Sequence, residues 1–532
     1  MDKPDFLFEV CFETCNKVGG IYTVVSSKAM KMVENYEGYV IIGPYNQGKS
    51  EKEFVEKKVP DEFKEIFKEL KEEGIRCHFG EWKIEGKPNT ILIDFQEYKG
   101  VLEHLKMRYW EEFKIDSMNS EWDFFEPMLW STAAGKLIEK YKEKNSTKSV
   151  IGHFHEWISG FGLLLLKLAK SPVKTVFTTH ATMLGRSMSG NGKNLYALLD
   201  KIEPEKEAKE HGVMNKFSTE KACAEQADVF TTVSEITGIE AEKILGKKPD
   251  LLLLNGLDIR EFPKTEKLHK IRDKSRKKLL EFADYFLGTS HLKDNNSKIL
   301  FTSGRYEFRN KGIDIFVKAL EQLNKEDDCE DIIAYFFVPN GWKNVYEEIN
   351  DWERKKKHGK QNEDIKLCTH ELETPDTDSL INALKESGLT NEKSSKVKCI
   401  VVPIYLEKND GLFGMHYYDI TSSCDLSVFA SWYEPWGYTP PESLAIGVPT
   451  ITTDQAGFGR FVNSLGELNN AVWVIERYMK DESDSIDELK GAIKEMLHRD
   501  TQLEDCRKIS SKTDWKEFIQ FYEKTYDLAI KK

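Results

Sequence analysis

The sequence has no apolar run long enough to cross a membrane. Its longest apolar stretch, Phe161 to Ala169, is interrupted by Lys167 and falls far short of the roughly 20 residues that a spanning helix needs. The start, Met1 to Asp5, lacks the charged-then-apolar layout of a signal peptide. The 9 cysteines include no CxxC pair, which argues against a disulfide framework or a zinc site. We therefore expect a cytoplasmic protein with reduced thiols and no membrane partner.

Positive charge is also in short supply. The chain has 77 Lys and Arg against 90 Asp and Glu, a formal net charge of −13. Such a balance repels nucleic acid and anionic lipid unless basic groups gather locally, so we expect no nucleic-acid partner. An anionic ligand must be met by a local site. The 532 residues, 40% of them hydrophobic, allow two to four domains.

Short apolar runs that alternate with helical patterns dominate the chain. Runs of this kind are typical of parallel strands buried on both faces, so they indicate an α/β protein with two doubly wound sheets. The boundary is expected near Phe262, after the turn Asn255-Gly256-Leu257-Asp258. The strands indicated are Phe6–Phe12, Val40–Gly43, Thr90–Phe95, Val150–His153, Val173–Thr179, Val229–Val233, Ile299–Ser303, Ile332–Pro339, Lys398–Ile404, Leu426–Ala430 and Thr450–Thr453.

Two further segments have a recognisable pattern. An apolar stripe over Gly312–Leu323 predicts an amphipathic helix that covers a sheet. The segment Trp342 to Lys366 is almost entirely polar and departs from the βα alternation. Its charge run is interpreted as a solvated helix face, with an oligomer contact as the alternative.

The segment from Ser431 to Glu442 follows the strand Leu426–Ala430, at the edge of the sheet where open α/β folds bind ligands. Thr439 and Glu442 have the spacing of a capping box, with Pro440 at the first helical position. Glu442 is therefore either a cap or a functional carboxylate. Glu434 lies before a proline and outside the helix, so it must be hydrogen-bonded, serve a ligand, or be a surface residue.

Basic and glycine-rich loops follow two other strands. Arg305 and Lys311 flank the loop after Ile299–Ser303, where a guanidinium, an ammonium and helix N–H groups could converge on a diphosphate. Gly19 and Gly20 follow the first strand and permit close approach of backbone to a ligand, although a plain tight turn is the commoner explanation.

Metal binding is the weaker interpretation at two places. His153 and His155 alternate on a strand and share a face, but no third ligand stands at a recognisable spacing. Asp376 and Asp378 imitate an Asp-x-Asp metal motif, yet they follow Pro375 in a polar turn, which favours turn and cap chemistry. We expect no metal.

Together these segments resemble the glycogen synthases of the animal and fungal type, family 3 of the retaining glycosyltransferases. The resemblance implies a GT-B fold with residues 1–262 as the acceptor-side domain, 263–514 as the donor-side domain, and a helix at about 515–532 returning to the first. It implies UDP-glucose as donor, an α-1,4-glucan (glycogen) as acceptor and no cofactor. The motifs that carry it are Lys17–Val24, His153–Trp157, Phe177–Thr182, Val229–Ser234, Asn255–Leu257, Gly304–Phe308 and Tyr433–Pro440.

The resemblance also implies roles for individual residues. Glu434 and Glu442 match the family's pair of glutamates, the first beside the transferred glucose and the second nearer the nucleotide. Arg305 and Lys311 match the diphosphate clamp, and Tyr417 falls where an aromatic ring stacks on uracil. The other residues matched to the donor site are Lys17, Gly19, Gly20, His180, Arg186, Asn255, Trp436, Gly437 and Thr439, with His180 also placed in catalysis.

The sequence departs from the family at two places. The arginine-rich helix that binds glucose 6-phosphate is reduced here to Arg499, Arg507, Lys508 and Lys512. We therefore expect no regulation by glucose 6-phosphate. The polar segment at 342–366 is shorter than the family's tetramer-building insertion, which leaves a homo-oligomer open.

Two rival functions are a glucan-binding or regulatory protein on an inactive GT-B scaffold, and the same fold with another sugar nucleotide or acceptor. A glucan phosphorylase is disfavoured, because the sequence around a lysine-anchored pyridoxal phosphate is not recognised.

Overall fold

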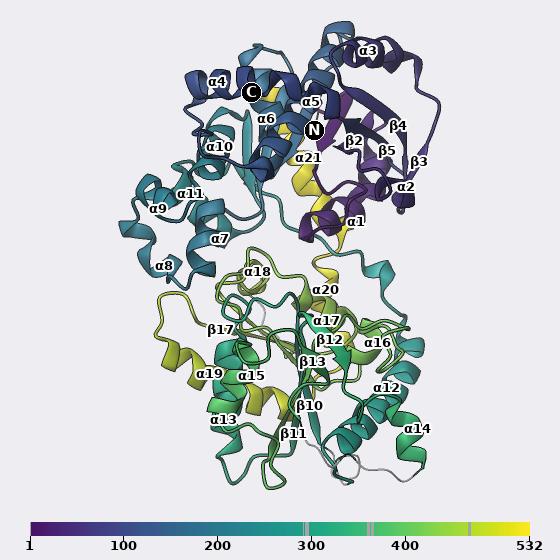
Figure 1. Ribbon diagram of the computed structural model, residues 1–532, viewed down its shortest axis with the longest axis vertical. Coiled ribbons are helices and arrows are strands. Elements are labelled where there is room, and N and C mark those ends of the chain that lie inside the picture. The colour runs from purple at the N-terminus through teal and green to yellow at the C-terminus, as the bar shows by residue number, and fades with distance from the viewer. Residues whose placement is uncertain (1, 291, 293–296, 359–361, 363–365, 467–469) are drawn as a thin grey trace. The chain divides into compact units, whose positions relative to one another are not determined.

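The computed structural model describes residues 2–290, 292, 297–358, 362, 366–466 and 470–532 (Figure 1). The chain divides into two compact units, Met1–Asp258 with Thr513–Lys532, and Ile259–Lys512. The division thus falls after Asp258 rather than at the expected residue 262. The reason is a backbone pairing: Leu257 N–H donates to Thr513 at 2.8 Å, and Trp515 N–H donates to Leu257 at 3.2 Å.

The first unit is built on a nine-stranded sheet in the order β3-β4-β5-β2-β1-β6-β7-β8-β9, in which β4 pairs antiparallel with β3 and β5 and the other neighbouring strands pair parallel. Its strands are β1 (Phe6–Val10), β2 (Tyr39–Pro44), β3 (Phe54–Glu56), β4 (Arg76–Trp82), β5 (Asn89–Asp94), β6 (Val150–His155), β7 (Lys174–Thr179), β8 (Val229–Thr232) and β9 (Leu251–Leu252). Its helices are α1 (Gly20–Asn35), α2 (Ser50–Glu53), α3 (Asp61–Glu72), η1 (Gln96–Val101), α4 (Leu102–Phe113), α5 (Trp122–Lys144), α6 (Glu156–Leu168), α7 (Met183–Gly190), α8 (Leu195–Leu198), η2 (Leu199–Lys201), α9 (Pro204–Glu210), α10 (Met214–Gln226), α11 (Glu235–Leu245) and α21 (Trp515–Lys531).

The second unit contains a six-stranded parallel sheet in the order β14-β11-β10-β15-β16-β17 and a small antiparallel pair, β12-β13. Its strands are β10 (Lys298–Ser303), β11 (Ile332–Phe337), β12 (Trp342–Val345), β13 (His370–Leu372), β14 (Val397–Val402), β15 (Leu426–Val428), β16 (Thr450–Thr453) and β17 (Val472–Ile475). Its helices are η3 (Ile259–Glu261), α12 (Thr265–Phe286), α13 (Ile313–Asn324), α14 (Trp352–Lys357), α15 (Ser379–Glu386), α16 (Tyr417–Thr421), α17 (Thr439–Ala445), α18 (Gly457–Ser464), α19 (Glu482–His498) and α20 (Leu503–Ser511).

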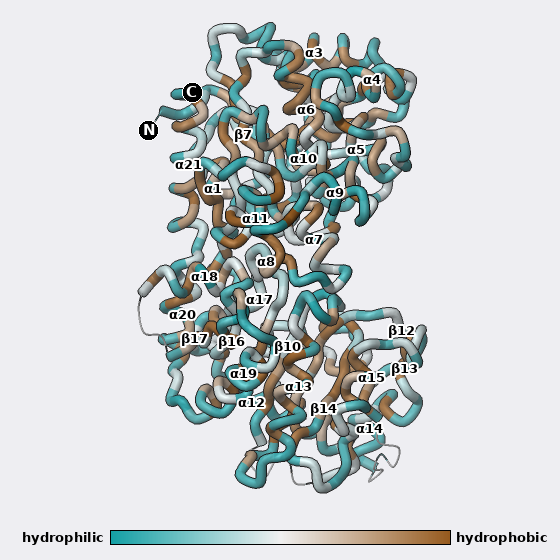
Figure 2. Tube along the Cα trace, turned by 90° about the vertical axis from the view of Figure 1, so that its left-hand side faces the viewer, coloured by the Kyte–Doolittle hydropathy of each residue, from teal (hydrophilic) through white to brown (hydrophobic). Residues whose placement is uncertain are grey.

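The predicted α/β class with two parallel sheets is confirmed. Each strand that the apolar runs indicated is present, with ends shifted by a few residues. The predicted amphipathic helix is α13, whose buried side chains Ile313, Phe316 and Leu320 pack in the core of the second unit. Hydrophobic segments, brown in Figure 2, run inside both units, as along β14.

The returning helix α21 belongs to the first unit, where Figure 1 shows it in yellow among elements of the N-terminal half. Its indole Trp515 Nε1 donates to Ser27 at 2.7 Å, and the hydroxyl of Tyr526 meets His153 Nδ1 at 2.9 Å. The C-terminal segment thereby closes over the sheet that carries the histidine motifs.

The polar segment at 342–366 contributes β12 and the exposed basic helix α14. Residues 359–361 and 363–365 of that segment lie outside the described residues. Among the residues that the structure describes, no helix has the length and apolar character needed to cross a bilayer.

Candidate active site

His180 lies just after β7, at the carboxyl end of an interior strand, and three glutamates hold its loop, of which Glu220 and Glu240 are buried and Glu156 is half-buried. Glu156 accepts hydrogen bonds from the backbone N–H groups of His180 and Ala181, at 2.8 and 3.1 Å. Glu220 accepts the N–H of Met183 at 3.0 Å, and Glu240 accepts the N–H of Thr182 at 3.2 Å. The backbone of residues 180–183 is therefore fixed by carboxylates from α6, α10 and α11.

These carboxylates are costly to keep ionised. Burial raises the pKa of Glu156 to about 7, and the charge of Arg186 opposes that rise. Burial together with the charge of Glu156 raises the pKa of Glu220 well above its usual value. Glu156 also has a left-handed backbone with φ 66°, a strained conformation for a residue other than glycine. Such strain and burial are typical of functional sites.

The side chain of His180 ends a chain of buried polar groups. His180 Nε2 lies 3.0 Å from Nδ1 of His155, and Nε2 of His155 lies 2.6 Å from Glu9. Glu9 also accepts hydrogen bonds from the ammonium of Lys28 and the hydroxyl of Tyr39. Glu9 and Lys28 are fully buried.

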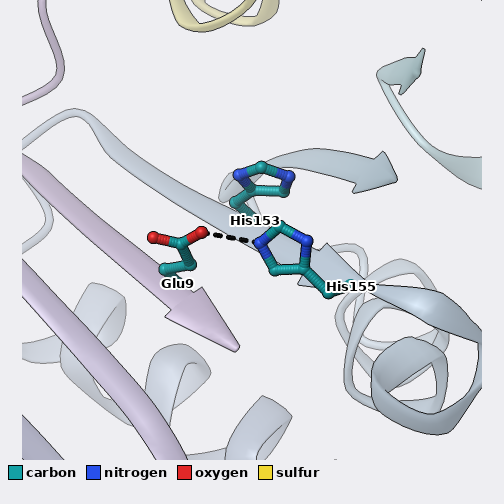
Figure 3. A group of neighbouring side chains, drawn as sticks. All are labelled: Glu9, His153 and His155. Atoms are coloured by element: carbon teal, nitrogen blue, oxygen red, sulfur yellow. Dashed lines mark hydrogen bonds and ion pairs between the residues drawn. The ribbon is translucent and has the colours of Figure 1, made fainter. Parts of the chain in front are cut away.

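Glu9 supplies the third potential metal ligand that the sequence did not reveal beside His153 and His155 (Figure 3). The β1–β6 register sets Glu9 opposite His153. Every ligand atom of the three is nevertheless engaged by protein. Lys28 already supplies the cation at Glu9, and His153 bonds Tyr526 and Thr178. This donor set does not fit a metal ion.

The double glycine lies at the start of α1. The carboxylate of Glu13 accepts the N–H groups of Gly19 and Tyr22, both at 2.8 Å. A Cβ on Gly19 would meet this carboxylate at 3.1 Å, whereas one on Gly20 would meet nothing within 4 Å. Glycine at position 19 thus leaves room for Glu13. Of the two glycines, only Gly20 has free space beside its backbone for the expected close approach of a ligand.

Three other predicted residues of the first unit, Lys17, Arg186 and Asn255, have different surroundings. Lys17 is exposed and its ammonium lies 5.7 Å from the ring centre of Tyr22. Arg186, on α7, acts electrostatically on both Glu156 and His180. Asn255 is buried, and its Oδ1 has no hydrogen-bond partner among the described residues.

In the second unit the structure joins Lys311 and Glu434 in an ion pair. Lys311 precedes α13 and Glu434 follows β15, so both come from carboxyl ends of neighbouring strands in the sheet. Their side chains are 20% and 17% exposed, which leaves both accessible to a ligand. A cation and a carboxylate stand together where the sequence expected a phosphate group and a sugar.

Arg305 stands apart from this pair. Its guanidinium lies 2.9 Å from Glu307 and its side chain is 60% exposed. The structure therefore places both predicted phosphate-binding cations on one loop, each paired with a different carboxylate.

The loop around Glu434 is fixed by backbone pairing with the start of α18. Gly457 N–H donates to Glu434 at 3.0 Å, and Phe458 N–H donates to Trp436 at 2.8 Å. Gly437 has φ 92°, a conformation that glycine adopts without strain. The indole of Trp436 is buried 6.2 Å from the ring of Phe458. Trp436 is therefore a packing anchor of this loop.

The capping box predicted for Thr439 and Glu442 is not formed. Tyr438 is already helical, with φ −79° and ψ −32°, so it occupies the N-cap and no side chain caps α17. Glu442 instead accepts a hydrogen bond from the hydroxyl of Tyr418. Burial, with the nearby charge of Glu261, raises the pKa of Glu442 to about 7.

Two other predicted residues have defined partners. The hydroxyl of Tyr417 lies 2.6 Å from Ser303 at the end of β10, so the ring stands beside the loop of Arg305. Asp378 caps α15 by accepting the N–H of Ile381 at 2.8 Å and also binds Asn340. The prediction of cap chemistry for this aspartate is confirmed.

Two of the four basic residues of the suspected effector stretch are held by different partners. Arg507 donates to the carbonyls of Ala445 and Pro263, and Arg499 pairs with Glu495. Lys508 and Lys512 lie on and after α20. The guanidinium of Arg507 therefore ties α20 to the end of α17.

A chain of two such parallel-sheet units, with polar side chains gathered at the carboxyl ends of their strands, has the GT-B glycosyltransferase fold. The catalytic domain of starch synthase IV from Arabidopsis thaliana, in a structure bound to ADP and acarbose, is similar with a TM-score of 0.57 at 15% identity, over 99% of each chain. A sucrose-phosphate synthase from Thermosynechococcus elongatus gives a TM-score of 0.52 at 13% identity, over 98% of each.

The protein belongs to the glycogen synthase family, whose model matches residues 9–350 and 353–532. The liver glycogen [starch] synthase of Mus musculus is 30% identical over 98% of this chain and 83% of its own length. Glycogen [starch] synthase isoform 2 of Saccharomyces cerevisiae is 29% identical over 99% of this chain and 86% of its own length. The resemblance inferred from the motifs is confirmed, and the protein is a glycosyltransferase.

Proposed function

We propose that the protein transfers glucose from UDP-glucose, with retention, to the non-reducing end of an α-1,4-glucan. The Lys311–Glu434 pair carries this proposal, because it combines a phosphate-binding cation and a sugar-facing carboxylate in one accessible place. Membership of the family supports the glucan acceptor.

Cleavage of the glucose–phosphate bond gives an oxocarbenium-like sugar and a diphosphate, so both charges must be stabilised at once. In this proposal the carboxylate of Glu434 faces the sugar, while Lys311 and Arg305 face the diphosphate. Donor binding then redirects the ammonium of Lys311 from Glu434 toward phosphate oxygens, which frees the carboxylate as the sugar becomes positive. Lys17, His180, Arg186, Asn255 and Tyr417 contribute to donor binding.

In this proposal, transfer depends neither on a metal ion nor on glucose 6-phosphate. Transfer requires no metal ion, since Arg305, Lys311 and helix N–H groups supply the positive charge for the diphosphate. Transfer also proceeds without glucose 6-phosphate, since the guanidinium of Arg507 donates its hydrogen bonds to backbone carbonyls instead of joining other cations in a phosphate site.

The cysteines support a cytoplasmic location for the proposed enzyme. All 9 cysteines are free thiols, and 8 of them are buried, which is typical of proteins from a reducing cytoplasm. A homo-oligomer is compatible with this function and is tested by light scattering of the purified protein.

The decisive experiment supplies radiolabelled UDP-glucose and glycogen and follows label in the polymer. We expect incorporation that an α-1,4-specific glucan hydrolase releases. ADP- and GDP-glucose in parallel assays test the donor base. Binding of glycogen with neither transfer nor donor hydrolysis would favour the inactive scaffold, and transfer from another donor alone would reassign the substrate.

A further inference from the structure

Glu9, Lys28, His155 and His180 form a buried polar group in the first unit. It holds one acid, one ammonium and two imidazoles in a line of hydrogen bonds that ends at the predicted site. His180 keeps only 8% of its surface exposed, and the other three are within 1% of full burial. No described residue hydrogen-bonds Nδ1 of His180, and that atom is not among the fully buried unpaired atoms.

The charges of this group fix where its hydrogens lie. Burial opposes ionisation, but the charge of Lys28 and the hydrogen bond from His155 hold the pKa of Glu9 well below its usual value. Glu9 is therefore an acceptor only, and Nε2 of His155 must carry the hydrogen that joins them. Burial lowers the pKa of His155, so the ring is neutral and its Nδ1 is an acceptor.

The hydrogen position on His155 fixes the one on His180. Since Nδ1 of His155 accepts, Nε2 of His180 must donate. Burial, followed by the neighbouring His155, lowers the pKa of His180 well below its usual value, so this ring is neutral too. Its Nδ1 is then left with a free lone pair.

Lys28 is the residue that decides this arrangement. With its charge in place, the Glu9–Lys28 pair is neutral, and a second positive charge on His155 would be buried without compensation. Without that charge, the hydrogen-bonded pair of Glu9 and His155 would take up a proton. The proton would lie either on His155, as an imidazolium beside the Glu9 carboxylate, or on Glu9, whose carboxyl would then donate to Nε2 of His155. In both cases Nδ1 of His155 carries a hydrogen and donates to His180, whose own hydrogen moves to Nδ1.

We propose that Glu9, Lys28 and His155 are positioning residues that hold His180 in the Nε2–H tautomer, so that its Nδ1 lone pair faces the donor sugar. The inference rests on the proposed function for its last step. The negative end of the imidazole dipole stabilises positive charge that develops on the sugar in the transition state. The opposite tautomer presents an N–H to the same charge and opposes it. Binding of the uncharged sugar changes much less.

The test reads the tautomer directly by two-bond ¹H–¹⁵N NMR of protein labelled at histidine, with the His180 signals assigned through His180→Gln. In the wild-type protein at pH 7 we expect a neutral His180 with hydrogen on Nε2. Hydrogen on Nδ1, or a doubly protonated ring, would overturn the proposal without any variant.

Lys28→Met then tests the cause. We expect His180 to change to the Nδ1–H tautomer, kcat to fall about tenfold or more, and UDP affinity to stay within about threefold. An unchanged tautomer would overturn the proposal. If this variant does not fold, Lys28→Gln replaces it, because Gln removes the charge and keeps a polar group beside Glu9, and an unchanged His180 tautomer there would overturn the proposal equally.

Lys398→Met is the matched control. Lys398 is a second buried lysine, 3% exposed, whose ammonium bonds the carbonyl of Glu392 in the other unit. Its loss should leave both the His180 tautomer and kcat unchanged. If the wild-type tautomer is as expected but no glucosyl transfer occurs, the proposed function fails while the positioning of His180 stands.

Discussion

Glu442→Gln distinguishes two roles for this carboxyl by the sign of its effect on stability. A carboxylate that caps the N-terminus of α17 would lose up to about 1 kcal/mol on conversion to an amide, at any pH above its titration, because its charge no longer interacts with the helix dipole. The structure instead places Glu442 against the hydroxyl of Tyr418, in surroundings that raise its pKa from 4.5 to about 7. An amide oxygen at this position still accepts the hydrogen from Tyr418 and carries no charge.

The pH dependence follows from the direction of that shift. A carboxyl whose pKa is higher in the folded than in the unfolded state contributes stability that is complete below pH 4.5 and is lost as pH rises through about 7. The full shift corresponds to about 3 kcal/mol, an upper bound because the side chain retains partial exposure. Glu442→Gln removes this loss. We therefore expect the variant to be more stable than the wild type by about 1–3 kcal/mol at pH 8.5, relative to their difference at pH 5.

The assay is urea unfolding followed by tryptophan fluorescence at pH 5, 7 and 8.5. Glu386→Gln, at an exposed position on α15 of the same unit, serves as the control and should show no pH-dependent difference. A uniform loss of about 1 kcal/mol in Glu442→Gln at all three pH values would refute the reasoning and restore the capping role.

Four further predictions concern the donor site and its regulation. Glu434→Gln should lower kcat by roughly 10²-fold or more with UDP affinity nearly unchanged, and a kcat within about threefold of wild type would contradict its role. EDTA should not abolish transfer, whereas loss that Mg²⁺ or Mn²⁺ reverses would show a metal requirement. Arg305→Ala should weaken UDP binding, measured by calorimetry, by about 1.5 kcal/mol, the low end for a charged partner because its side chain is 60% exposed. Initial rates at subsaturating UDP-glucose should rise less than about tenfold with millimolar glucose 6-phosphate, since a larger activation would require about 1.4 kcal/mol of coupling.

The sheets could be predicted because parallel strands that are buried on both faces have continuous apolar sequences. The run Ile332–Pro339, for example, became β11 (Ile332–Phe337) with every residue buried. Most predicted site residues follow such strands directly, so the place of Glu434 and Lys311 was predictable from order along the chain. Their mutual ion pair was not, because it joins residues 123 positions apart.

The supporting carboxylates were missed for a similar reason. Glu156, Glu220 and Glu240 come from three helices and hydrogen-bond the same loop. Their spacing in the sequence does not indicate that they lie close together. Glu9 left one usable signal, a charge in the middle of the apolar strand Phe6–Val10. A buried charge must be paired, so this position indicated a partner without naming Lys28. The Thr439 cap failed because the spacing of a capping box says nothing about the backbone conformation of Tyr438.

The two ion pairs, one in each unit, differ in how far a ligand can reach them. Glu9 and Lys28 are wholly buried, so no ligand can replace either partner, and breaking the pair would leave an uncompensated charge in the core. Lys311 and Glu434 keep 20% and 17% of their side chains exposed, so a phosphate can compete for the ammonium at little cost in desolvation. A pair that cannot exchange partners can only fix the geometry and hydrogen positions of its neighbours. A pair that can exchange is able to respond to the substrate, which supports the role proposed for Lys311 and Glu434 beside the reacting groups.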